Sequence, residues 1–209
     1  MSQLLSLATI LVASMQGIIG ARREEPMEDV FGTDGISDSN SFNEAVMGAH
    51  NEYRQMHHSQ HLLLDPQLTE QAQKYAKELS IRGMSQLQHS LGYKEKKYGE
   101  NIYASCDSHV LPIVPVKNWY SKVCNYDFLA HAPWNKMSPV KDFTQIVWRG
   151  SEKIGVGRAL SNHDKACTYI VAQYLPRHDP NLRRSNVDIG DFNKEICKDL
   201  SYVGFGATG

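Results

Sequence analysis

Apolar positions recur at helical spacing in two segments, which begin near residues 41 and 66. Ser41 to Glu44 reads Ser-Phe-Asn-Glu, the Ser-x-x-Glu form of a capping box, and apolar residues follow at intervals of three and four as far as Met56. Asp65 and Pro66 supply an N-cap and a proline at the first helical position, and a second apolar face then runs to Gly83. The pattern predicts two amphipathic helices.

The later pattern predicts two shorter helices and then a hairpin. Apolar residues 116, 119, 120 and 123 indicate a third helix, and a short fourth helix is expected over 141–147. Two β-rich runs, 154–160 and 167–174, are separated by the polar turn 161–165 and predict an antiparallel hairpin. After Pro176 the chain turns polar, so residues 181–209 are expected to be a C-terminal extension that packs loosely on the domain.

The amino-terminal residues have the pattern of a leader followed by a linker. An apolar run from Leu4 to Ile19 precedes small residues and two arginines, which predicts a signal peptide over residues 1–21. The run has no Lys or Arg before it, so a short membrane anchor is the alternative; the signal peptide is favoured, and with it a secreted, extracellular protein with no stable membrane span. Residues 22–40 are rich in Asp, Glu, Gly and Pro and predict a flexible acidic linker.

Composition narrows the class of protein. A chain of 209 residues that is 41% hydrophobic and 22% charged fits one globular domain with short extensions, here expected over 41–180. The 22 Lys and Arg balance 23 Asp and Glu, for a net charge of −1. Because no basic footprint is present, nucleic acid is not expected as a partner.

Four cysteines leave the redox state open. Cys106, Cys124, Cys167 and Cys197 allow two disulfides in three connectivities, and no close Cys-x-x-Cys pair indicates a zinc knuckle. The alternative is that Cys167, inside an apolar run, is a buried free thiol.

Five segments occur in the order seen in one known family: 49–54, 68–76, 99–102, 119–120 and 143–148. They resemble elements of the CAP superfamily, the SCP/TAPS, pathogenesis-related and venom allergen-like proteins. They are nearest to its Golgi-associated plant pathogenesis-related type, although a secretory leader is predicted here. The resemblance implies an α+β fold, a three-layer α-β-α sandwich with a central antiparallel sheet.

The same resemblance implies a degenerate site. The family groups two histidines and two glutamates in a central cleft, which holds a divalent ion in some members. His89 and Glu100 match the first of each, whereas Lys122 stands at the second glutamate and Asp142 at the second histidine. We expect Lys122 and Asp142 to form an ion pair, and no cofactor; His89, Glu100 and Asp142 are the weaker candidates for a metal site.

Other polar residues suggest chemistry less strongly. A hydrolase could use Ser105 as nucleophile with His89 and Glu100, but Gly-x-Ser-x-Gly is absent and Ser105 is more simply the end of a strand. His57, His58 and His61 are expected to be solvated at the end of the first helix.

The segment 125–139 corresponds to a loop that is implicated in sterol binding in CAP proteins. Its candidates are Tyr126, Phe128, Leu129 and Trp134, and the apolar segment 110–115 could extend the surface; both segments could instead cover the core. The expected function is a secreted, non-catalytic binding protein for a sterol, another lipid or a protein partner. The alternatives are a cation-dependent or hydrolytic enzyme and a structural or immunomodulatory protein with no small ligand.

Overall fold

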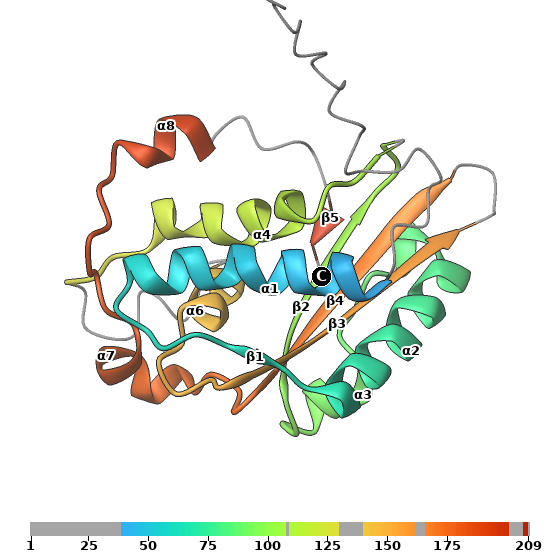
Figure 1. Cartoon of the computed structure of the whole chain (residues 1–209), viewed down its shortest axis with the longest axis horizontal. Helices are drawn as coiled ribbons and strands as arrows, with labels where there is room; N and C mark the ends of the chain where they lie inside the picture. The colour runs from blue at the N-terminus through green and yellow to red at the C-terminus, as the bar shows by residue number, and fades with distance from the viewer. Residues whose placement is uncertain (1–38, 108, 130–139, 162–165, 201–206, 209) are drawn as a thin grey trace, which may run out of the picture. The chain divides into compact units, whose positions relative to one another are not determined.

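Helices cover both faces of one β-sheet in the computed structural model, which describes residues 39–107, 109–129, 140–161, 166–200 and 207–208. The predicted signal peptide, nearly all of the linker and Trp134 lie outside these residues. Helix α2 packs on one face of the sheet, and α1, α4 and α6 lie on the other (Figure 1). The helices are α1 Ser39–Met56, α2 Pro66–Arg82, α3 Leu91–Lys94, α4 Ile113–Tyr120, α6 Lys141–Ile146, α7 Arg183–Asn186 and α8 Ile196–Leu200, with 3-10 turns η1 Met84–Gln86, η2 Ser121–Asn125 and η3 Pro180–Leu182.

The predicted helices are confirmed, although α1 begins earlier than predicted and Val123, which was expected in the third helix, lies in the 3-10 turn η2. Asp65 caps α2 as expected, because its side chain accepts hydrogen bonds from the amides of Gln67 and Leu68. Helix α1 begins at Ser39, two residues before the predicted capping box. Among the described residues, no helix is both long and apolar enough to cross a membrane.

The sheet has the strand order β1-β3-β4-β2-β5 and is antiparallel apart from a short parallel pairing at β1. The predicted hairpin is confirmed, since β3 and β4 pair from Lys153 opposite Leu175 to Ser161 opposite Cys167. Together with its flanking helices, the sheet confirms the three-layer α+β fold. The strands are β1 Leu63–Leu64, β2 Gly99–Ser105, β3 Lys153–Ser161, β4 Cys167–Leu175 and β5 Ala207–Thr208.

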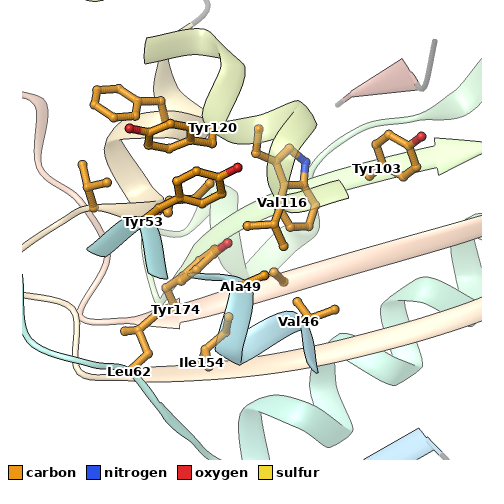
Figure 2. Close-up of a cluster of buried hydrophobic side chains, with 14 of the residues drawn as sticks. Val46, Ala49, Tyr53, Leu62, Tyr103, Val116, Tyr120, Ile154 and Tyr174 are labelled. Carbon is orange, nitrogen blue, oxygen red and sulfur yellow. The ribbon is translucent and has the colours of Figure 1, made fainter. Parts of the chain in front are cut away.

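Aromatic side chains fill the core on the α1 side of the sheet. Tyr53 and Tyr120 stack with their ring centroids 3.7 Å apart (Figure 2). Below them, Tyr174 reaches from β4 and donates its hydroxyl to His50 Nε2 at 2.8 Å, while His50 Nδ1 donates to the Val46 carbonyl at 2.7 Å. His50 therefore joins α1 to the sheet.

Arg54 is a fully buried cation that ties four carbonyl groups together. Its guanidinium donates to the carbonyls of Gln60, Ile146, Trp148 and Ser151 at 2.6–2.9 Å. Burial lowers the pKa of Arg54 to about 10, so the side chain stays charged at neutral pH. These bonds fix the carboxyl end of α6 against α1 and thereby position Asp142 at its start.

Both disulfides form, so the free-thiol alternative for Cys167 is wrong. Cys106 pairs with Cys167, and Cys124 pairs with Cys197. The first bond joins the end of β2 to the start of β4. The second ties the chain that follows β4 to η2, so these residues are held more closely than the expected loose extension.

His57 is also more buried than predicted. Its Nδ1 donates to the Asp188 carbonyl at 2.6 Å, and its Nε2 accepts from the Tyr120 hydroxyl at 2.8 Å. The expectation of a solvated histidine is wrong here because the returning chain covers the end of α1, which no local pattern reveals. His58 and His61 are exposed, as expected.

Candidate functional site

Glu100 is a buried carboxylate with hydrogen bonds to both oxygens. Its Oε1 accepts from the Ser90 amide at 2.8 Å and from His89 Nδ1 at 3.0 Å, and its Oε2 accepts from Gln173 Nε2 at 2.9 Å. Gln173 lies directly opposite Glu100 in the sheet, so the register of β2 and β4 creates this contact. Three donors compensate for the removal of the carboxylate from water.

Glu100 in turn fixes the orientation of His89. When Nδ1 donates to the carboxylate, Nε2 of the neutral ring is left as an acceptor. The His89 ring stacks on the Tyr93 ring, with centroids 3.8 Å apart. The Arg177 guanidinium lies 5.4 Å from the centroid of the same Tyr93 ring. His89 is therefore a positioned imidazole with one nitrogen available.

Asp142 lies in the first turn of α6 and is about nine-tenths buried. Burial raises the pKa of its carboxyl to about 6, against the opposing effects of the charges on Lys122, His89 and Lys141. Lys122 stays partly exposed on η2, and in the described part of the chain no nitrogen–oxygen distance of 4.0 Å or less joins it to Asp142. The expected contact ion pair is wrong, because an ammonium that keeps its water avoids a large desolvation cost.

The tetrad positions do not fit a divalent ion in this arrangement. Both oxygens of Glu100 and Nδ1 of His89 already make hydrogen bonds, which leaves His89 Nε2 and the Asp142 carboxylate. Zinc usually takes three or four protein ligands. Across the described ranges, no group of three or more His, Cys, Asp or Glu side chains is placed to hold a metal ion.

Ser105 lies too far from His89 to form a catalytic pair. It is the last residue of β2, which confirms that it ends a strand, and its hydroxyl donates to Asp107 Oδ2 at 2.6 Å. Glu100 is five positions earlier in the same strand, roughly 16 Å away, and an odd offset places the two side chains on opposite faces. The arrangement required for the hydrolase is not formed.

The raised pKa of Asp142 predicts a pH-dependent stability. A carboxyl whose pKa is higher in the folded chain than its ordinary 3.8 destabilises the fold as pH rises through about 6. We expect Asp142→Asn to be about 3 kcal/mol more stable than the unmodified protein at pH 8, and the difference to vanish below pH 4. Urea unfolding from pH 3.5 to 8 measures this.

The exposed Asp199→Asn is the matched control and should leave the pH profile of stability unchanged. An Asp142→Asn variant that gains no stability between pH 4 and pH 8 would contradict burial as the source of the shift.

A second candidate site is an apolar pocket of about 500 Å³. Tyr126, Phe128 and Leu129 form one wall, so the structure brings together the three described lipid-binding candidates. Phe128 lies 4.8 Å from Tyr126 and 5.6 Å from Phe192, measured between ring centroids. The remaining lining residues are Val123, Cys124, Asn125, Asp127, Ile189, Phe192 and Lys194.

The segment 110–115 does not extend this pocket. Pro115 is buried, and Val110, Ile113 and Val114 pack against the core, which leaves Leu111 exposed. Of the two readings of this segment, the one in which it covers the core agrees with these contacts.

Sequence reasoning missed several residues of both sites. Gln173 is a buried amide within an otherwise apolar strand, and that contrast is a signal of a polar contact. Ile189 and Phe192 follow the predicted hairpin in a polar segment, where their role depends on the path of the returning chain. No local pattern identifies them.

Comparisons with known proteins agree with this architecture. The model of the cysteine-rich secretory protein family, CAP, matches residues 47–174. Golgi-associated plant pathogenesis-related protein 1 from Homo sapiens is 34% identical over 143 residues, which are 68% of this chain and 87% of that protein. Secreted protein RBT4 from Candida albicans is 30% identical over 142 residues, 68% of this chain but only 36% of that protein.

A solved structure shares the fold. The structure of BmVAL-1 superposes with a TM-score of 0.55 at 19% identity, over 73% of this chain and 82% of that one. The class of protein is therefore an α-β-α sandwich with a polar cluster at the start of β2. The chain belongs to the CAP family.

Proposed function

We propose that this chain is a secreted, non-catalytic CAP protein that binds a sterol or a similar small lipid in the aromatic pocket. The pocket formed by Tyr126, Phe128 and Leu129 with Ile189 and Phe192 is the observation that carries the proposal. Its volume of about 500 Å³ lies in the range of small-molecule sites, which are typically concave and mainly apolar.

The size of the pocket favours a small lipid over a protein partner. A stable protein interface needs about 800 Å² from each side, usually over a broad surface. Here the apolar lining gathers in one hollow between two chain segments. Asn125, Asp127 and Lys194 supply polar groups that could contact the hydroxyl of a sterol.

Secretion is supported by the two disulfides, which persist in oxidising compartments. The predicted leader over residues 1–21 supplies the route. One relative is described as a secreted protein, which agrees with secretion, whereas another is described as Golgi-associated.

The lack of a catalytic arrangement at the tetrad supports a binding role. Lys122 stands at a position where the family has a glutamate, and Ser105 lies out of reach of His89. Glu100 and His89 then act as a hydrogen-bonded support for the start of β2. No reaction step is assigned to them.

Fluorescence titration with dehydroergosterol tests the proposal. Leu129 is 89% exposed, so Leu129→Asp is expected to weaken binding about tenfold or more without unfolding the chain. Tyr126→Ala and Phe128→Ala should weaken binding similarly, because each removes an aromatic ring of the lining.

Leu160→Asp is the matched control, since Leu160 is an exposed leucine on β3 outside the pocket lining. Unmodified protein that fails to bind, or equal affinities for the Leu129 and Leu160 variants, would count against the lipid site. If binding is absent and a protein ligand depends on Leu129, the surface serves a protein partner instead.

A further inference from the structure

One wall of the aromatic pocket is built by chain that follows the family domain. The CAP match ends at residue 174, whereas Ile189, Phe192 and Lys194 line the pocket opposite the loop that carries Phe128. Phe192 contacts the aromatic rings of both His57 and Phe128, at 6.0 and 5.6 Å. The pocket is therefore a property of this chain's carboxyl-terminal segment as much as of the common fold.

The segment is anchored to α1 at its amino-terminal end. The Asp188 carbonyl accepts from His57 Nδ1 at 2.6 Å, and the Asp191 amide donates to the Met56 carbonyl at 2.8 Å. Gly190 has a φ of +51° and lies so close that an added Cβ would be 2.1 Å from the Met56 carbonyl oxygen. These contacts bring Ile189 to the pocket.

The other end of the segment is anchored by a covalent bond. Cys197, in α8, is joined to Cys124, and Cys124 itself lines the pocket. The three residues between Phe192 and α8's first turn, 193–195, are exposed. Leu200 packs on the core beyond the bond, but that contact is reversible and lies on the far side of Cys197.

We propose that residues 188–197 form a clasp over the aromatic loop 123–129, and that the Cys124–Cys197 disulfide holds the clasp closed. The pocket is complete only when this bond is formed, so ligand binding depends on redox state. This inference rests on the proposed lipid-binding function. It adds Phe192 and Ile189 as residues that determine which ligand fits.

Opening the clasp requires a two-electron reduction. A dithiol supplies two electrons and two protons, the sulfur–sulfur bond of Cys124 and Cys197 breaks to give two thiols, and the dithiol becomes a cyclic disulfide. Phe192 and Ile189 are then held by the contacts near α1 and by the reversible packing of Ile196 and Leu200 on the core, with no covalent tether on that side. Because the lining on that side loses its tether, the cavity loses its defined shape.

The chain offers a matched pair of variants. Cys124→Ser with Cys197→Ser removes the clasp bond, and Cys106→Ser with Cys167→Ser removes the other disulfide. The two bonds span similar separations, 73 and 61 residues, so both double variants lose a similar chain-entropy contribution to stability. Of these two disulfides, only Cys124–Cys197 borders the pocket.

Amide hydrogen exchange of residues 189–194, without ligand, is the first measurement. We expect exchange about tenfold faster or more in the Cys124/Cys197 variant and unchanged in the Cys106/Cys167 variant. Dithiothreitol should speed exchange in the Cys106/Cys167 variant, which keeps the clasp bond, and leave the Cys124/Cys197 variant unaffected. Equal exchange in both double variants overturns the clasp.

Dehydroergosterol binding is the second measurement. The Cys124/Cys197 variant should bind about tenfold more weakly or worse, and the Cys106/Cys167 variant like the unmodified protein. Faster exchange with unchanged affinity overturns the link between clasp and pocket. Phe192→Ala keeps both disulfides and should also weaken binding; unchanged affinity there overturns its role in the lining.

The failure of the proposed function is distinguishable from the failure of the clasp. If the unmodified protein does not bind dehydroergosterol, the lipid proposal fails for every variant. Amide hydrogen exchange of residues 189–194 then still tests the clasp. Faster exchange confined to the Cys124/Cys197 variant supports the clasp, and equal exchange in both double variants refutes it.

Discussion

Arg54→Met is expected to lower the free energy of unfolding by about 4 kcal/mol, because four carbonyls, three of them in buried contacts, lose their donor. The guanidinium reaches the carbonyls of Gln60, Ile146, Trp148 and Ser151, which belong to two segments of chain. Methionine fills much of the space but donates nothing. Urea unfolding with the disulfides intact gives the difference from the shift in midpoint.

Two further variants separate the hydrogen bonds from the charge. Arg54→Lys keeps a cation but offers three donors without the planar fork, so an intermediate loss is expected. Arg82→Met removes an arginine whose surface ion pair with Glu78 contributes little, and should change stability by less than about 1 kcal/mol. An Arg54→Met loss no larger than that of Arg82→Met would refute the role of these bonds.

Local sequence patterns were sufficient where the structure depends on local physics. The Asp65 and Pro66 start of α2 and the two β-rich runs of the hairpin depend on neighbouring residues and on periodicity, and both are confirmed. The family's ordered segments placed His89 and Glu100 at one site, and the structure brings them within 3.0 Å.

The errors arose where an interaction depends on chain paths that are far apart in sequence. Lys122 and Asp142 stand at the positions of the family's second glutamate and second histidine. Whether the Lys122 ammonium reaches the Asp142 carboxylate depends on how far each side chain is buried. His57 is predicted to be solvated because it lies at the end of the first helix, but the chain at Asp188, 131 residues later, covers it. Arg54 lies in a segment that resembles the family, yet three of its four acceptors come from the end of α6 and the residues after it, which no local pattern places beside Arg54.

Two glycines on β3 are a further case in which a contact between segments far apart in sequence explains a residue type. The sequence pattern places Gly155 and Gly157 in a strand, and the structure shows why these positions lack side chains. A Cβ at Gly155 would lie 2.1 Å from the Leu68 backbone, and one at Gly157 would lie 2.3 Å from the backbone of Ala72 and Gln73. Helix α2 therefore rests directly on the strand.

Gly157→Ala is expected to destabilise the fold by about 3 kcal/mol, because the added methyl meets backbone atoms that have no rotamer to change. Gly155→Ala should act similarly, and the two effects should fall short of additivity since one shift of α2 relieves both. Thermal unfolding of the single and double variants, followed by circular dichroism, measures this.

Gly48→Ala is the control with the opposite sign. Gly48 lies inside α1, and an added Cβ there would meet no atom within 4 Å. Alanine is the better helix former, so this variant should gain about 0.5–1 kcal/mol. If Gly157→Ala proved as harmless as Gly48→Ala, α2 could not rest on β3 as closely as the structure has it, and the layer that supports Gln173 and Glu100 would need a different packing.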